Sequence, residues 1–238
     1  MTWSIIARDA RTEKFGIAVA TRFFAAGALV PYTQAGVGAI ASQALINPFF
    51  GGNGLKLLRE GLSAAETLSK LVASDDGRAH RQAHVMDATG NAAIHTGVSC
   101  IDWCGGISEP NLSVTGNMLA NAGVIAATAA AYRAHSNGAF ARRLIAALKA
   151  GEAAGGDKRG KQSAALVVQG DEDWPDLDLR VDDHADPLAE LERLENVSRE
   201  RFVHFMRCLP NQANPKGITD RTAIEAEIER ARRALSQT

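Results

Sequence analysis

Thr2, near the beginning of this chain, could carry out nucleophilic catalysis with two groups, its hydroxyl and an α-amine. A small residue after an initial Met normally allows Met1 to be removed, and Thr2 would then hold an α-amine beside its own hydroxyl. The amine, with a pKa of about 8, can take the hydroxyl proton near neutral pH, so the pair supplies a nucleophile and its base. Many proteins have Ser, Thr or Ala here for processing reasons alone, so this position does not by itself establish catalysis.

Three further residues are candidates to act beside Thr2. Ser4 shares a strand face with Thr2, because side chains alternate along a strand; it would be a helper, or the nucleophile of a chain trimmed differently. Asn117, in the element T-G-N-M-L, would orient a substrate or donate to an oxyanion, or else form a turn into a helix. Arg22 ends the second apolar run; it would hold a substrate carboxylate, or be a surface cation.

Two polar loops supply the remaining candidates. Residues 155–163 read G-G-D-K-R-G-K-Q-S, where the glycines bring backbone N–H groups close to an anion and Arg159 offers a planar fork for a carboxylate, with Gln162 beside it. The order is not that of a Walker phosphate loop. Asp182, Asp183 and His184 would form a base or a metal site, or would cap the helix that follows.

Charge is distributed unevenly around these two loops. Residues 171–195 hold eleven Asp and Glu but two Arg, and residues 133–161 hold seven Lys and Arg against two acids. Such faces are commonly just solvated, but the asymmetry also predicts that Arg159 lies near the 182–184 turn, at a cleft mouth or across a dimer interface. We therefore expect substrate contacts from Arg22, Arg159, Gln162, Asp182, Asp183 and His184.

Composition excludes several classes of protein. The net charge of −1 does not imply a nucleic-acid partner, and no apolar run reaches the length of a membrane span. Arg8 and Asp9 interrupt the apolar stretch near the start, so we predict no signal peptide and a cytoplasmic protein. The odd number of cysteines argues against a disulfide framework, and their spacing predicts no metal site; no cofactor is expected.

Hydrophobic periodicity predicts an α+β fold. Hairpins of strands alternate with pairs of helices, without the regular β-α order of a doubly wound parallel sheet. The predicted strands are 3–7, 15–20, 28–31, 37–44, 82–86, 92–95, 112–118, 162–169 and 177–181. The predicted helices are 54–60, 63–74 (with a capping box at Ser63 and Glu66), 121–135, 138–149, 185–207 and 219–236.

The domain prediction follows from this order of elements. We expect one domain over residues 1–210 and a charged helical tail over residues 211–238. The last helix has few apolar residues, so it is weakly attached or meets a partner subunit, which favours a homodimer or a higher homo-oligomer.

Two resemblances accompany these patterns. The opening resembles N-terminal-nucleophile hydrolases, especially proteasome β-subunits, in which Thr begins strand one; Gly16–Arg22 is similar to their second strand, although the family's Asp position holds Ala20 or Thr21 here. Most of the chain, from residue 2 to about 205, is similar to the N-terminal-nucleophile-hydrolase-like family called domain of unknown function 1028. The stretches that carry this second resemblance are T-W-S-I-I-A-R-D (2–9), G-A-L-V-P-Y (27–32), A-G-V-G-A-I-A-S-Q-A (35–44), T-G-N-M-L (115–119), G-G-D-K-R-G-K-Q-S-A-A-L (155–166) and L-R-V-D-D-H (179–184).

The resemblance implies a four-layer αββα sandwich but no known reaction. We predict hydrolysis of a small amide or peptide-like bond in a carboxylate-bearing substrate, with Thr2 as nucleophile and Asn117 at the oxyanion. The alternative is a catalytically inactive protein of the same fold that binds a small anionic ligand or serves as an assembly subunit.

Overall fold

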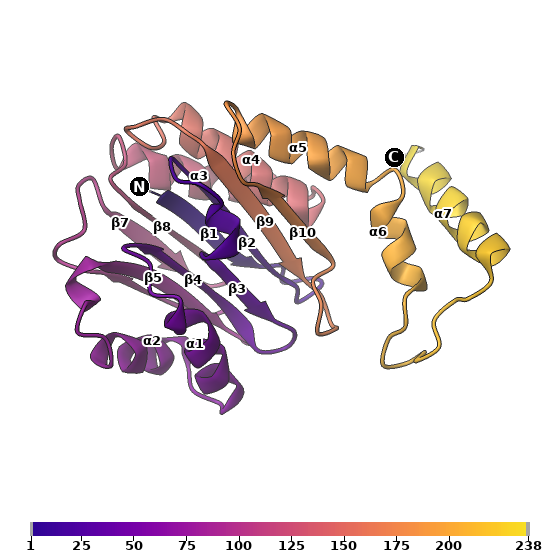
Figure 1. Ribbon diagram of the computed structural model, residues 1–238, viewed down its shortest axis with the longest axis horizontal. Helices are drawn as coiled ribbons and strands as arrows, with labels where there is room; N and C mark the ends of the chain where they lie inside the picture. The colour runs from indigo at the N-terminus through magenta and orange to yellow at the C-terminus, as the bar shows by residue number, and fades with distance from the viewer. Residues whose placement is uncertain (1, 237–238) are drawn as a thin grey trace. The chain divides into compact units, whose positions relative to one another are not determined.

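Two antiparallel sheets form the centre of the fold in the computed structural model, which describes residues 2–236 (Figure 1). The first sheet has six strands in the order β10-β9-β2-β1-β8-β7, and the second has four in the order β3-β4-β5-β6. The strands are β1 Thr2–Arg8, β2 Phe15–Thr21, β3 Pro31–Gln34, β4 Gly38–Ala44, β5 Arg81–Asp87, β6 Ala92–Thr96, β7 Gly105–Glu109, β8 Leu112–Asn117, β9 Ser163–Gln169 and β10 Leu177–Val181.

Seven α-helices lie within the described residues, which confirms the α+β class. They are α1 Phe49–Arg59, α2 Ala64–Ala73, α3 Gly123–Ala134, α4 Phe140–Ala153, α5 Pro187–Ser198, α6 Phe202–Phe205 and α7 Arg221–Ser236. The predicted capping box is present at the start of α2, where Ser63 and Glu66 bond each other's backbone N–H groups. In this part of the chain, no helix combines the length and apolar character that crossing a membrane requires.

Each sheet carries a pair of helices on its outer face. Helices α3 and α4 pack against the six-stranded sheet, while α1 and α2 pack against the four-stranded sheet (Figure 1). The inner faces of the two sheets meet, with β1 and β2 of the first against β4 of the second. Strand β1 is therefore covered on both faces, which fits its nearly continuous burial.

Alternation along β1 separates two environments. Trp3 lies toward the helices, where the position of a Cβ on Gly151 of α4 would be 2.8 Å from its indole nitrogen. Ser4 points to the other sheet, where its hydroxyl bonds Gln43 of β4. Ile6 follows on this inner face and joins an apolar cluster with Met86. The layer between the sheets is thus apolar around Ile6 and polar around Ser4.

Two predicted boundaries in the first 60 residues were wrong. Residues 28–31 were expected as a strand, but a 3-10 turn at Ala26–Ala28 precedes β3, which begins at Pro31. The first helix begins at Phe49 and not at 54, because its glycines serve close packing: a Cβ on Gly51 would stand 2.2 Å from the Tyr32 ring. Glycines that let a helix approach a sheet resemble helix breakers when only the sequence is read.

Two further differences concern edges and ends. Strand β7 was not predicted, because it is a short, half-exposed edge strand with a single large apolar residue. The single helix expected over 185–207 is divided: after Ser198, the N–H groups of Arg199 and Glu200 bond carbonyls three residues back, which tightens the last turn and ends α5.

The chain separates into two compact units, divided between Leu191 and Glu192. The first unit holds both sheets and helices α1 to α4. The second unit contains α6 and α7, and its α7 begins at Arg221, close to the predicted start of the charged last helix. The candidate site lies entirely in the first unit.

Candidate active site

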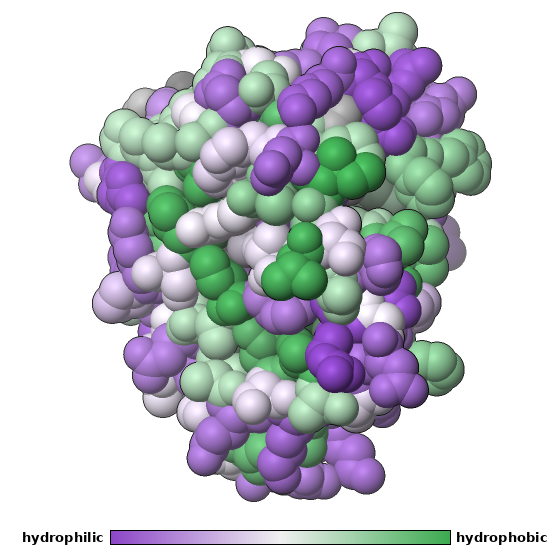
Figure 2. Space-filling view, turned by 90° about the vertical axis from the view of Figure 1, so that its left-hand side faces the viewer, coloured by the Kyte–Doolittle hydropathy of each residue, from purple (hydrophilic) through white to green (hydrophobic). Residues whose placement is uncertain are grey.

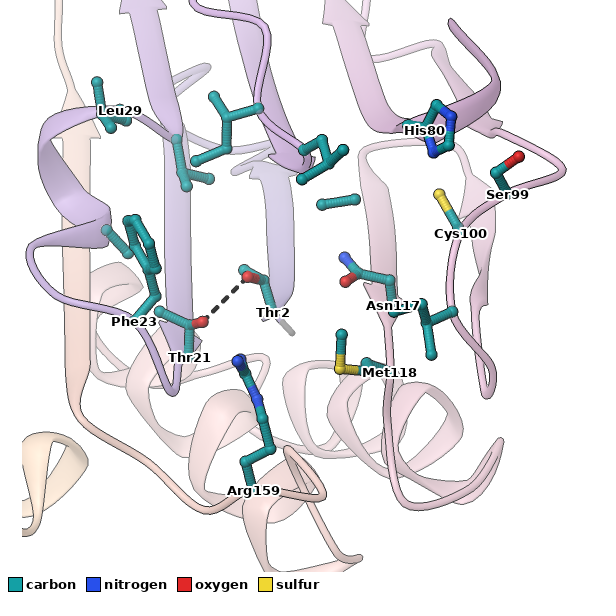
Figure 3. Close-up of a pocket in the computed structure, with 16 residues that line it drawn as sticks. Thr2, Thr21, Phe23, Leu29, His80, Ser99, Cys100, Asn117, Met118 and Arg159 are labelled. Carbon is teal, nitrogen blue, oxygen red and sulfur yellow. Dashed lines mark hydrogen bonds between the residues drawn. The ribbon is translucent and has the colours of Figure 1, made fainter. Parts of the chain in front are cut away.

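Strand pairing brings Thr2, Thr21 and Asn117 side by side at one end of the six-stranded sheet. Thr2 pairs with Thr21 of β2 on one side and with Asn117 of β8 on the other. The Thr2 hydroxyl donates to Thr21 Oγ1 at 3.1 Å, and the amide of Asn117 faces Thr2 from the opposite side (Figure 3). Residues distant in the sequence therefore surround Thr2 because they occupy equivalent positions on three adjacent antiparallel strands.

A cavity of about 470 Å³ opens beside these three residues. Its volume lies within the range of small-molecule sites. Most of its wall is apolar, from side chains such as Val30, Ile46 and Met118, and its titratable side chains in the described part of the chain are His80, Cys100 and Arg159. Burial raises the pKa of Cys100, so this thiol is not an activated nucleophile.

The mouth of the cavity exposes large apolar side chains. Phe23, Leu29, Leu45 and Ile101 line it and keep 38 to 61% of their surface exposed. Figure 2 views the end of the sheets at which β1 begins and shows apolar side chains gathered across the middle of this face. An apolar entrance of this kind favours an apolar ligand over a highly charged one.

The glycine-rich loop places Arg159 in the cavity lining with Thr2 and Thr21, and Asp157 against the backbone of Arg22. Asp157 is buried; its Oδ2 accepts from the Arg22 N–H at 2.9 Å and its Oδ1 from the Arg159 N–H at 2.8 Å. The Arg159 guanidinium lies 3.3 Å from Asp157 Oδ2, and its side chain extends toward Thr2 and Thr21 (Figure 3). Among residues 2–236, Arg159 is therefore the one Lys or Arg side chain that lines the cavity, and its carboxylate-binding role stays a prediction.

The loop's backbone does not form the anion cradle that its glycines suggested. The Gly156 N–H bonds the Gly151 carbonyl, and the Gly160 N–H bonds the Asp157 carbonyl. Both donors are used in holding the loop's own conformation, so the expectation of a backbone anion site at these two glycines was wrong. The side chain of Arg159 is what the loop offers to the cavity.

The other predicted substrate contacts form a polar cluster away from the lining of the cavity. The exposed Arg22 donates to the Lys161 carbonyl, and Gln162 donates to Asp183 Oδ1 at 3.0 Å. Asp182 pairs with Arg180, and the His184 N–H bonds the Gln162 carbonyl. The two oppositely charged loops thus lie side by side through Gln162, while the side chain of Arg159 turns to the cavity. Asp186, and not the 182–184 turn, accepts from a helical N–H of α5.

Gly116 fixes the direction of a chain of hydrogen bonds beneath Asn117. Its carbonyl can only accept, so the side-chain atom of Gln82 at 2.8 Å must be the amide nitrogen. The Gln82 oxygen then accepts from Asn117 Nδ2 at 3.0 Å and from Gln43 Nε2 at 2.8 Å. Gln43 Oε1 must in turn accept the Ser4 hydroxyl proton at 2.7 Å. One of the two N–H groups of Asn117 is used in this way.

The same chain of bonds continues to His84 and assigns its tautomer. Because Ser4 gives its proton to Gln43, its oxygen accepts from His84 Nε2 at 2.9 Å. His84 Nδ1 then accepts the hydroxyl proton of Ser113 at 3.0 Å. His84 is a donor to Ser4 and not its base, and Ser4 has no exposed surface. Of the two roles predicted for Ser4, helper and nucleophile, the hydrogen bonds and the burial argue against the nucleophile.

Burial keeps His84 neutral. Desolvation lowers its pKa to about 3, because the ring is fully buried and its hydrogen-bond partners, the hydroxyls of Ser4 and Ser113, carry no charge that would favour the imidazolium. A neutral ring is also what the hydrogen bonds require, since one ring nitrogen accepts and the other donates.

The dependence of stability on pH should reveal His84. In the unfolded chain its pKa returns to about 6.5, so below this pH the unfolded chain binds a proton that the folded chain excludes. The contribution of neutral His84 to the free energy of unfolding is therefore complete above pH 6.5 and is lost as the pH is lowered toward 3. Between pH 7 and 5, wild type should lose about 2 kcal/mol more unfolding free energy than His84→Gln, measured by urea denaturation. Equal losses would contradict the assignment.

Sequence reasoning missed Thr21, Gln43, Gln82 and His84. The signal was present: each is polar within a run of buried strand residues, and Gln82 and His84 alternate on one face of β5. Polar residues at alternate positions of a buried strand must find partners, so their pattern marks a polar layer between sheets.

Comparison with known proteins places this site in a family. The profile described as "Family of unknown function (DUF1028)" matches residues 2–191. The chain belongs to the DUF1028 family. This confirms the resemblance read from the sequence, and the match ends at Leu191, where the first compact unit also ends.

A solved structure from the same family is closely similar. The crystal structure of the DUF1028 protein SPO2555 from Silicibacter pomeroyi has 34% identity and a TM-score of 0.85, covering 92% of this chain and 99% of that one. Anbu (ancestral beta-subunit) from Yersinia bercovieri matches with 10% identity and a TM-score of 0.38, over 82% of this chain and 94% of that one, a likeness too low to argue from. None of the curated proteins searched matches the chain.

Proposed function

We propose that this DUF1028 protein is an N-terminal-nucleophile hydrolase that cleaves a small amide bond with Thr2. The observation that carries the proposal is the position of Thr2 at the start of a buried central strand, beside a cavity of ligand size and between Thr21 and Asn117. The arrangement of two facing sheets with outer helix pairs supports the finer proposal, a four-layer αββα sandwich of the N-terminal-nucleophile type.

The α-amine of Thr2 is the base in this mechanism. The side chains that flank the Thr2 hydroxyl are a second hydroxyl and an amide, and neither accepts a proton at neutral pH. Release of the residue before Thr2 would place an amine of pKa about 8 next to the hydroxyl it must deprotonate. The bond to Thr21 orients the hydroxyl, and the second N–H of Asn117 would donate to the oxyanion.

The reaction proceeds through an ester. Thr2 Oγ1 attacks the carbonyl carbon, a C–O bond forms, and the hydroxyl proton passes to the α-amine. The C–N bond then breaks, and the proton is transferred to the leaving nitrogen. Water next attacks the ester, giving one proton to the α-amine; cleavage of the C–O bond releases the acid, and the proton returns to Thr2 Oγ1.

A blocked terminus tests the assignment of the base. Protein that retains the residue before Thr2 keeps the hydroxyl but loses the amine, so we expect its turnover to fall by about 10²- to 10⁴-fold. Intact mass of protein from its native host identifies the terminus, and N-acyl amino acids, γ-glutamyl amides and short peptides serve as substrates. Removal of the blocking residue by an aminopeptidase should restore the rate. Full activity in the blocked form would rule out the α-amine as the base.

A further inference from the structure

The cavity beside Thr2 has a strongly apolar wall. Ala26, Leu29, Val30, Leu45, Ile46 and Ile101 contribute to it, and no Asp or Glu side chain lines it within residues 2–236. Burying an acyl chain here removes apolar surface from water on both ligand and protein. A peptide of polar residues would instead lose hydration without gaining partners.

Arg159 gives the same cavity one charged position. Its buried neighbour Asp157 already accepts two backbone N–H groups, from Arg22 and from Arg159 itself. The guanidinium adds a single longer contact of 3.3 Å to Asp157, and 44% of the Arg159 side chain remains exposed. Since the guanidinium has five N–H donors, most of its fork stays available to a planar anion such as a carboxylate.

Thr2 lies between these two parts of the cavity. In Figure 3 the Arg159 side chain approaches Thr2 and Thr21 from one side, whereas Leu29 and Phe23 stand on the walls beyond them. A bond attacked by Thr2 would therefore have an apolar group on one side and an anion a short distance away on the other. An amide whose acyl part is apolar and whose amine part carries a nearby carboxylate has this order of groups.

We propose that the cavity takes N-acyl amino acids with an apolar acyl chain, with their carboxylate at Arg159. The proposal rests on the hydrolase function above, which defines the position of the scissile bond. Cleavage of the C–N bond by water gives the apolar carboxylic acid and the amino acid. The apolar wall selects the acyl chain, and Arg159 selects the carboxylate.

Binding measurements test this selection without requiring turnover. Full-length Thr2→Ala protein is titrated by calorimetry with N-hexanoylglycine, N-acetylglycine, which lacks the long chain, and N-hexanoylglycinamide, which lacks the carboxylate. N-hexanoylglycine should bind at least about tenfold more tightly than either partial ligand. In the same background, Arg159→Met should weaken N-hexanoylglycine by about 10- to 100-fold and leave N-hexanoylglycinamide unchanged.

Matched variants separate local effects from general ones. Arg11→Met removes the same charge in the hairpin at the opposite end of β1, and should leave binding unchanged. Leu29→Glu places a charge in the apolar wall and should weaken the binding of N-hexanoylglycine more than that of N-acetylglycine. Val98→Glu alters a 96% exposed side chain outside the cavity lining and should leave the binding of both ligands unchanged.

Each result decides between the two proposals. If the three ligands bind equally, or none binds, or Arg159→Met weakens the amide as much as the acid, the substrate class is wrong. If binding follows the expected pattern but wild type hydrolyses none of the ligands, the ligand class stands and the hydrolase function fails. If Thr2-dependent cleavage is found for amides without a carboxylate and N-hexanoylglycine does not compete, the hydrolase function stands and this inference fails.

Discussion

Replacing Thr2 by Ala is expected to abolish amide hydrolysis while leaving the fold intact. The substitution removes one hydroxyl and one methyl group at a strand start, together with a hydrogen bond to Thr21, so the free energy of unfolding should fall by only about 1 kcal/mol. Loss of the nucleophile removes the covalent path itself, and turnover should drop by about 10⁴-fold or more. Steady-state rates on the substrate panel and thermal melting measure the two effects separately.

Two further variants make this result specific. Thr2→Ser keeps both hydroxyl and amine, so a measurable part of the rate should survive. Thr12→Ala makes the same change in the exposed hairpin turn at the far end of β1 and should retain the wild-type rate. Thr2 is not the nucleophile if Thr2→Ala turns over any panel substrate at the wild-type rate.

Replacing Gln82 by Met should destabilise the protein strongly, by about 3–5 kcal/mol. The two side chains have similar volumes, so packing changes little, but the substitution leaves the Gly116 carbonyl, Asn117 Nδ2 and Gln43 Nε2 without the partner each has in a buried site. A buried polar group deprived of its hydrogen bond costs about 1–3 kcal/mol, although Gln43 keeps a 3.2 Å contact to Thr115.

Gln34→Met provides the matched control for this prediction. Gln34 ends β3 in a partly exposed position, where it accepts from Arg59, so its replacement should change stability by no more than about 0.5 kcal/mol. Urea denaturation gives both unfolding free energies. Similar small losses for the two variants would show that the hydrogen-bond chain beneath Asn117 contributes little to stability.

Parts of the fold that rest on local rules were predictable from the sequence. The β1–β2 hairpin was expected from two apolar runs around a polar turn, and the capping box at Ser63 from its spacing to Glu66. Prediction failed where tertiary packing overrode local signals. Gly51 lies inside helix α1, and a glycine is needed there because the Tyr32 ring leaves no room for a side chain. The oligomeric state and the 1–210 domain boundary remain predictions.

The sequence by itself determined the candidates Thr2, Asn117 and Arg159 and the membership of the chain in the DUF1028 family. Only the tertiary structure decided which candidates meet, because strand register joins residues 2, 21 and 117, and loop closure turns Arg159 toward them. The tertiary structure also places the Ser4 hydroxyl in a buried hydrogen bond to Gln43, and it leaves Arg22, Asp183 and His184 outside the cavity lining. The physical reason is that residue type fixes what a group can do, whereas pairing between distant strands fixes what it can reach.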